Sequence, residues 1–310
     1  MDLAFFASCT ILENIEKAYE AQGEIMKMNF ANPKTDFTFK RLFGSDGHKR
    51  LTISLLNSIL GRTKNNEIAD IKFCNIENIP VAQGEKESYL DILCTDKLDN
   101  KFIIEMQVAK EQGFRKRSLF YTAFNIVDQM HDGDDYIKIK PVIFIGILNH
   151  PMFANRDRVI SHHLLCDMDT GQQSFEEVEF HYVELCNFNK DLNELQTNLD
   201  KWLFFLKQAE SLTMIPDEFA QLPEFKEAFQ VIQQSLWTPE ERRAYRKSLD
   251  ALHQNNRLQA GIFEEGLEEG IQRKSQAVAV NLLKMGISVE VIAQGTGLSI
   301  EQIELLQKNL

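Results

Sequence analysis

Two acidic residues and one glutamine in this chain have the types and spacing that could do chemistry. Asp91 lies in one short apolar run, and Glu105 and Gln107 lie in the next. Two carboxylates held on paired strands can bind a hard divalent cation, because such ions prefer oxygen ligands. Beside a phosphodiester, this kind of ion activates a water and stabilises the charge of the transition state. The pattern is therefore typical of a metal-dependent nuclease.

Both runs alternate with the period of two that a β-strand requires. In residues 89–95 and 101–108 the even-numbered residues are apolar, whereas Asp91, Glu105 and Gln107 hold odd positions. Each predicted strand thus has one apolar face and one face that carries polar groups. The turn decides whether Asp91 and Glu105 share a face.

The connection over residues 97–101 allows two hairpins. A two-residue loop at Asp99 and Asn100 would place Asp91 and Glu105 on opposite faces of the hairpin. A three-residue loop over residues 98–100, with Asn100 left-handed, would place Asp91 opposite Gln107 and on the same face as Glu105. Only the second hairpin makes a site.

A resemblance to a known family strengthens this interpretation. Ordered blocks of the chain resemble the PD-(D/E)XK nuclease family transposases of the recombination-promoting nuclease type, strongly over residues 28–150 and more loosely beyond. The blocks are residues 33–44, 55–60, 90–92, 104–107, 117–121 and 133–136.

The resemblance implies an α/β fold with a restriction-endonuclease-like mixed sheet flanked by helices, followed by an all-α C-terminal region. It implies a Mg²⁺ site at the hairpin, with Asp91 and Glu105 as metal-binding acids. Gln107 matches a position usually filled by Lys, and a neutral amide can orient a water but cannot supply a positive charge. A nuclease fold that has lost catalysis and serves as an interaction or structural protein is therefore the rival interpretation.

Asp36 is the candidate third metal ligand. It precedes a predicted helix through Phe43 that Gly44 closes, so a helix N-cap is the alternative role for its carboxylate. We leave both roles open at this point.

Nucleic acid is the expected partner, although the chain has a net charge of −12. The candidate contacts are Lys40 and Arg41 ahead of the site and Arg117 and Tyr121 after it. A helix is predicted over residues 114–130, with Phe120, Phe124 and Val127 buried and with Arg117 and Tyr121 turned to the exposed side. A guanidinium there could bind a phosphate.

We expect four segments along the chain. They are an N-terminal extension (1–27), the nuclease-like domain (28–198), a helical region with a charged linker (199–274) and a small helical unit (275–310). The extension lacks the basic start of a signal peptide, so either translation begins at Met26 or Met28, or residues 11–25 form an extra helix.

The C-terminal segments indicate protein contacts. Thr238 and Pro239 predict a helix start, and residues 240–274 read as a long exposed helix, a coiled-coil arm or a linker. Residues 275–310 resemble a helix-turn-helix, but Glu301 and Glu304 on the last helix would be repelled by phosphates. We therefore favour a helical bundle or homo-oligomer formation through these helices over reading of the major groove.

Composition agrees with a cytoplasmic protein that has no membrane segment. The five cysteines form no CxxC pair and read as reduced thiols. The sequence thus predicts a Mg²⁺-dependent endonuclease that hydrolyses DNA during recombination or transposition, with RNA as the alternative substrate.

Overall fold

The computed structural model describes residues 28–74, 90–153 and 157–310. The described residues form a six-stranded sheet in the order β1-β2-β3-β4-β6-β5. Its strands are β1 (Ile71–Phe73), β2 (Ile92–Asp96), β3 (Lys101–Gln107), β4 (Val142–Leu148), β5 (Ile160–Cys166) and β6 (Gln173–Glu184). The sheet is mixed, because β3, β4 and β6 are parallel whereas β1, β2 and β5 pair antiparallel with their neighbours.

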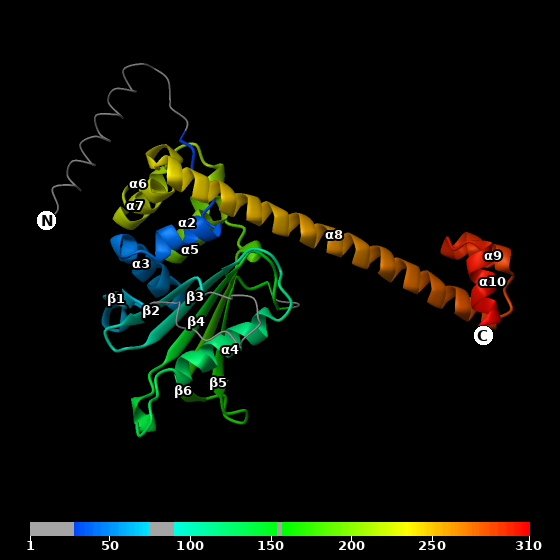
Figure 1. Ribbon diagram of the computed structural model, residues 1–310, viewed down its shortest axis with the longest axis horizontal. Coiled ribbons are helices and arrows are strands. Elements are labelled where there is room, and N and C mark those ends of the chain that lie inside the picture. Colours follow the sequence, from blue (N-terminus) through cyan, green and yellow to red (C-terminus); the bar gives the residue numbers. More distant parts are fainter. Residues whose placement is uncertain (1–27, 75–89, 154–156) are drawn as a thin grey trace, which may run out of the picture. The chain divides into compact units, whose positions relative to one another are not determined.

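Helices cover both faces of the sheet, as Figure 1 shows. The α-helices are α2 (Asp36–Phe43), α3 (Lys49–Leu60), α4 (Phe114–Val127), α5 (Asn198–Gln208), α6 (Asp217–Ala220), α7 (Pro223–Ile232), α8 (Pro239–Lys284), α9 (Val289–Thr296) and α10 (Ile300–Lys308). One face packs on α2, α3, α5, α6 and α7, and the other packs on α4. The expected mixed sheet flanked by helices is confirmed.

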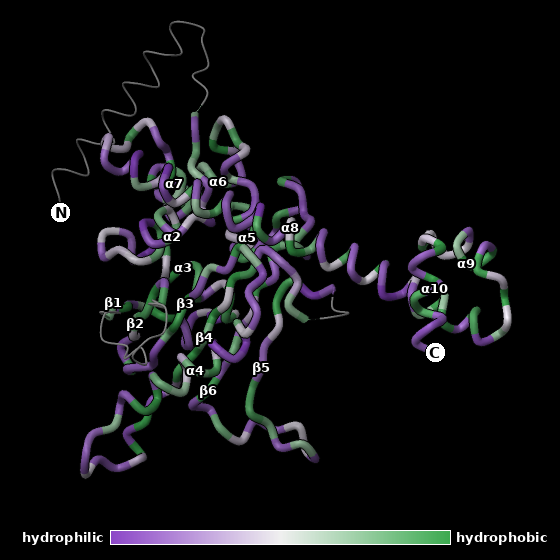
Figure 2. The backbone as a smooth tube through the Cα atoms, turned by 45° about the vertical axis from the view of Figure 1, so that its right-hand side comes forward, coloured by the Kyte–Doolittle hydropathy of each residue, from purple (hydrophilic) through white to green (hydrophobic). Residues whose placement is uncertain are grey.

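The central strand β4 shows how the sequence produces these two layers. All of its residues are buried, as expected for a parallel strand covered on both sides. Ile143, Ile145 and Ile147 face the larger core, and Phe144 and Leu148 face the α4 layer. In Figure 2 the hydrophobic colour gathers in the strands, whereas α8 is largely hydrophilic.

The β2–β3 hairpin decides the geometry of the site, and its loop differs from the expected one. Asp96 and Asn100 close a three-residue loop that begins at Lys97, one residue earlier than predicted. Asp99, not Asn100, is left-handed, with φ of 63°. The carboxylate of Asp96 accepts hydrogen bonds from the backbone of Leu98 at 2.9 Å and of Asn100 at 3.0 Å, which stabilises this turn.

The resulting register places Ile92 opposite Ile104, so its continuation places Asp91 opposite Glu105 rather than Gln107. Asp91 and Glu105 share one face of the hairpin, as the three-residue loop requires. The prediction that the two acids share a face was therefore right. The predicted pairing of the strands was wrong by two residues on β3.

Helix α4 buries a different side from the one that its apolar residues indicate. Ser118, Tyr121 and Asn125 are buried, whereas Phe120 and Val127 are 57% and 68% exposed. The reason is hydrogen bonding into the sheet: Ser118 Oγ lies 2.6 Å from the hydroxyl of Tyr182 on β6. Two polar groups that hydrogen-bond to each other can be buried at low cost. The spacing of the apolar residues alone therefore predicted the wrong buried face of α4.

The chain divides into two compact units at residue 250. Helices α5, α6 and α7 contribute Trp202, Phe219 and Phe229 to the larger core. The expected division at residue 199 stays a prediction. Residues 240–274 belong to the continuous helix α8, which Thr238 begins by accepting a hydrogen bond from the backbone of Glu241.

The second unit, residues 251–310, has a small core of its own. Ala279, Ile292, Leu298 and Ile303 are its buried residues. On α8, exposed apolar side chains recur on one helical face at Phe263, Leu267, Ile271 and Val278. Homo-oligomer formation through these helices stays a prediction.

Gly146 on β4 provides a test of the packing beside the site. It lies between Glu105 on β3 and Tyr182 on β6, and a Cβ atom there would lie 2.9 Å from Cδ1 of Tyr182. We expect Gly146→Ala to lower the free energy of unfolding by about 1–3 kcal/mol, because the ring must shift. Urea unfolding measures this. Gly47→Ala, whose Cβ would meet only Ser45 Oγ at 3.6 Å, is the control and should change stability by about 0.5 kcal/mol or less.

Candidate metal and nucleic-acid site

Asp91 and Glu105 form a reciprocal pair at the start of the β2–β3 hairpin. The backbone N–H of Asp91 donates to Glu105 Oε1 at 3.2 Å, and the backbone N–H of Met106 donates to Asp91 Oδ2 at 2.7 Å. One oxygen of each carboxylate is thereby fixed by the backbone of the opposite strand. The other oxygen of each carboxylate, Asp91 Oδ1 or Glu105 Oε2, is left for another partner.

Two cations approach these remaining oxygens without forming close hydrogen bonds. Lys40 Nζ on α2 lies 3.8 Å from Asp91 Oδ1. Arg117 Nη2 on α4 lies 3.9 Å from Glu105 Oε2. The two carboxylates are largely buried, with side chains 16% and 5% exposed. The site therefore holds two acids whose charge is only partly compensated within the protein.

The cost of this arrangement appears in the protonation of the acids. Burial raises the pKa of Asp91, although the hydrogen bond from the Met106 N–H and the positive charge of Lys40 both lower it. Burial also raises the pKa of Glu105, and the negative charge of Asp91 raises it further. Perturbed carboxyl groups in pairs are typical of functional sites. A divalent cation would remove the repulsion between them.

Lys40 connects the pair to Asp36. Its ammonium lies 2.7 Å from Asp36 Oδ1. Burial lowers the pKa of Lys40, but the bond to Asp36 and the charges of the nearby acids raise it by more, so the pKa is raised. The helix N-cap is Thr35, which accepts from the backbone of Thr38, so Asp36 is not the cap. Asp36 is the first residue of α2, and its side chain is 62% exposed.

Arg117 and Gln107 form a second network beside Glu105. Arg117 Nη2 donates to Gln107 Oε1 at 3.1 Å, and Arg117 Nη1 donates to both carboxylate oxygens of Glu111, at 2.7 and 2.6 Å. Gln107 Nε2 donates to the carbonyl of Ala109 at 3.0 Å and to Glu111 at 3.3 Å. The side chain of Gln107 is thus held on the same side of the hairpin as Glu105.

Two of the four predicted nucleic-acid contacts, Tyr121 and Arg41, are engaged within the protein. Tyr121 is 3% exposed and packs in the α4 layer, so it cannot face a ligand as predicted. Arg41 pairs with Glu241 on α8, and its guanidinium lies 5.5 Å from the ring centre of Trp237. Lys40 and Arg117 are the two that lie beside the acids.

Sequence reasoning missed Glu111, whose carboxylate completes the network around Arg117. The only signal was an acid in the loop that follows Gln107 and precedes α4. Spacing alone gave no reason to pair it with Arg117, because that contact depends on how α4 packs on the sheet.

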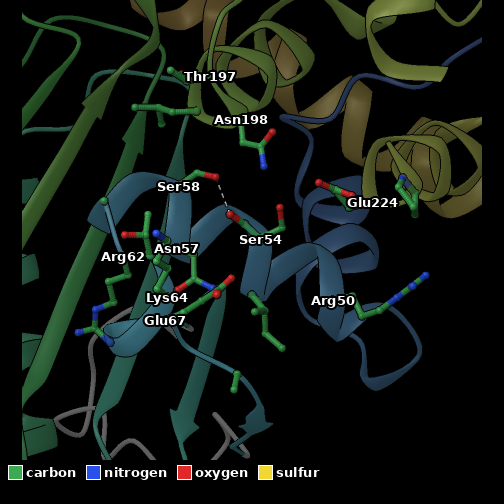
Figure 3. A pocket seen from close by; sticks show the side chains of 16 residues that line it. Arg50, Ser54, Asn57, Ser58, Arg62, Lys64, Glu67, Thr197, Asn198 and Glu224 are labelled. Carbon is green, nitrogen blue, oxygen red and sulfur yellow. Dashed lines mark hydrogen bonds between the residues drawn. The ribbon is translucent and has the colours of Figure 1, made fainter. Parts of the chain in front are cut away.

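A separate groove lies away from these residues. It has a volume of about 800 Å³ and is lined by α3, by the segment that follows it and by the first residues of α5 and α7. Figure 3 shows Ser54, Ser58 and Asn198 on its walls. The residues that line this groove do not include Asp91, Glu105 or Gln107.

Comparison with known proteins gives one result. A protein-family model described as PD-(D/E)XK nuclease family transposase matches residues 33–261. The chain belongs to this family. No curated protein and no solved structure matches it. The matched span contains the whole sheet and the Asp91–Glu105 pair, so this PD-(D/E)XK protein carries the paired acids within its family-defining region.

The two carboxylates suit a hard cation that keeps most of its bound waters. Among the described residues, no group of three or more His, Cys, Asp or Glu side chains is placed to hold a metal ion. Mg²⁺ is usually bound through one or two carboxylates, with waters and substrate phosphates completing its shell. Asp91 Oδ1 and Glu105 Oε2 are carboxylate oxygens of the kind that such an ion binds. In the part of the chain that the structure describes, every helix is too short or too polar to cross a bilayer.

The buried pair predicts a stability effect in the absence of metal. A raised pKa in the folded state means that the protonated form is favoured there, so stability is present at low pH and is lost as pH rises through the folded pKa. We expect Glu105→Gln to unfold at the same or a higher temperature than the wild type in EDTA, with an advantage that grows from acid to neutral pH. Thermal unfolding across pH measures this. A variant less stable at neutral pH than at acid pH, relative to wild type, would contradict it.

Proposed function

We propose that the protein is a Mg²⁺-dependent endonuclease that hydrolyses DNA phosphodiester bonds in recombination or transposition. One observation carries the proposal: two buried carboxylates on one face of a hairpin each keep one oxygen that no group among the described residues binds closely. Membership of the nuclease family supports the reaction, and the word transposase in the family description supports the process.

Asp91 and Glu105 would hold the metal ion in this proposal. A bound Mg²⁺ would stabilise charge on the phosphoryl oxygens and lower the pKa of a water at the site. Arg117 and Lys40 supply positive charge on either side of the acids, where a polyanion must approach. Gln107, held by Arg117 and by the Ala109 carbonyl, can orient a water by hydrogen bonds but cannot accept its proton as a base.

Asp36 has a different role in the proposal. Its carboxylate is engaged by Lys40, which lies between it and Asp91, so it sets the charge and position of Lys40. We therefore treat Asp36 as a positioning residue for Lys40 and not as a metal ligand.

The substrate is tested directly with purified protein. Plasmid DNA and a structured RNA are each incubated with Mg²⁺ and, in parallel, with EDTA. We expect cleavage of DNA in Mg²⁺ and none in EDTA. Cleavage of RNA alone would replace DNA by RNA as the substrate, and cleavage of neither would favour a nuclease fold that has lost catalysis.

The catalytic acids predict a sharp loss of cleavage. Asp91→Asn and Glu105→Gln should each reduce the rate of plasmid nicking by about 10³-fold or more, because each removes one ionised ligand and with it several kcal/mol of charge stabilisation. Asp36→Asn is the matched control and should stay within about tenfold of the wild type, since its charge acts through Lys40. Cleavage at the wild-type rate by either hairpin variant would remove the catalytic assignment.

Gln107 predicts a smaller effect. Gln107→Ala should lower the cleavage rate by about 10²-fold or less, because the amide orients groups but carries no charge. Gln107→Lys should keep or raise the rate, since an ammonium there supplies the missing positive charge. Single-turnover rates measure both. A Gln107→Lys protein that is folded, binds Mg²⁺ and cuts nothing would show that the amide has another role.

A further inference from the structure

The carboxylate of Glu111 lies where an anion bound by the site would lie. It accepts hydrogen bonds from Arg117 Nη1 through both oxygens, at 2.7 and 2.6 Å, and a third from Gln107 Nε2 at 3.3 Å. The same guanidinium extends to within 3.9 Å of Glu105 Oε2 through its other nitrogen. One arginine therefore faces a metal-site acid with one end and Glu111 with the other.

The partners of Glu111 are the groups that recognise a phosphate. A guanidinium binds carboxylate and phosphate oxygens with the same geometry, and an amide N–H can donate to either. Neither oxygen of Glu111 is left without a donor from this pair of side chains. The carboxylate thus occupies the anion position of Arg117 and Gln107.

The two members of the ion pair are not equally fixed. Arg117 is on helix α4, its side chain is 24% exposed, and its guanidinium lies 5.1 Å from the ring centre of Phe114. Glu111 is in the loop between β3 and α4, and its side chain is 48% exposed. Since exposed ion pairs contribute little stability, Glu111 can leave at low cost while Arg117 stays in place.

We propose that Glu111 mimics a substrate phosphate on Arg117 and Gln107 and must be displaced before nucleic acid binds next to the metal site. This inference rests on the proposed function, because it assigns a phosphate subsite to the same site. It makes Glu111 a residue that weakens substrate binding. Neutralising it should therefore improve binding.

Binding of a short fluorescent DNA duplex in EDTA tests the proposal without any cleavage. We expect Glu111→Gln to bind about two- to fivefold more tightly than the wild type, the effect of removing one competing exposed ion pair. The dependence of log affinity on log salt should become steeper by up to about 0.9, the slope of one added phosphate contact. Circular dichroism checks that the variant is folded.

Asp128→Asn is the matched control. Asp128 pairs with Lys101 at 3.3 Å, its side chain is 55% exposed, and it follows the other end of α4. The substitution removes the same charge and releases a cation, but away from the site. We expect Asp128→Asn to change the affinity for the DNA duplex less than Glu111→Gln does.

A second comparison uses the Arg117→Ala background. If Glu111 acts by occupying Arg117, Glu111→Gln should give no gain once Arg117 is absent. A gain that persists without Arg117, or a gain no larger than that of Asp128→Asn, would overturn the proposal. Loss of Mg²⁺ binding in Glu111→Gln, measured by calorimetry, would also overturn it, because Glu111 would then be a metal ligand.

Failure of the proposed function would look different. A wild-type protein that binds the duplex but never cuts DNA or RNA would remove the endonuclease activity and leave the Glu111 effect intact. Absence of binding by every variant would overturn both.

Discussion

The site depends on one constraint, the register of the β2–β3 hairpin. With Ile92 opposite Ile104, the carboxylates of Asp91 and Glu105 each accept a hydrogen bond from the backbone of the facing strand. A slip of one residue would turn one acid to the other face of the sheet. The register is fixed from both sides, by the Asp96 turn and by the apolar residues of the two cores.

The same constraint explains the electrostatics of the site. Backbone N–H groups hold one oxygen of each acid, and packing of the sheet leaves the side chains of Asp91 and Glu105 only 16% and 5% exposed. Among the described residues, the cations that approach these charges are Lys40 and Arg117, each nearly 4 Å away. Burying two partly compensated carboxylates costs free energy, and the folded protein tolerates this because the backbone bonds are satisfied. The same two carboxylates are the residues that we propose as metal ligands.

The surrounding cations are positioned by elements from both layers. Lys40 comes from α2 on one side of the sheet and Arg117 from α4 on the other. Helix α4 is held by the bond between Ser118 and Tyr182, and Tyr182 can lie there because Gly146 has no side chain. A chain of packing contacts therefore connects the middle of the sheet to the guanidinium next to Glu105 and to the Glu111 carboxylate that it binds.

The sequence alone determined the two strands of the hairpin, the identity of the paired acids and their shared face, because alternation and short turns are local properties. It also indicated the family through ordered motifs. It did not determine the register, since the choice between Asp99 and Asn100 as the left-handed residue depends on the Asp96 side chain. Nor did it determine the buried face of α4, the ion pair of Arg41, the burial of Tyr121 or the partner of Glu111. Those were decided by tertiary structure, because each depends on which hydrogen-bond and ion-pair partners distant segments bring together.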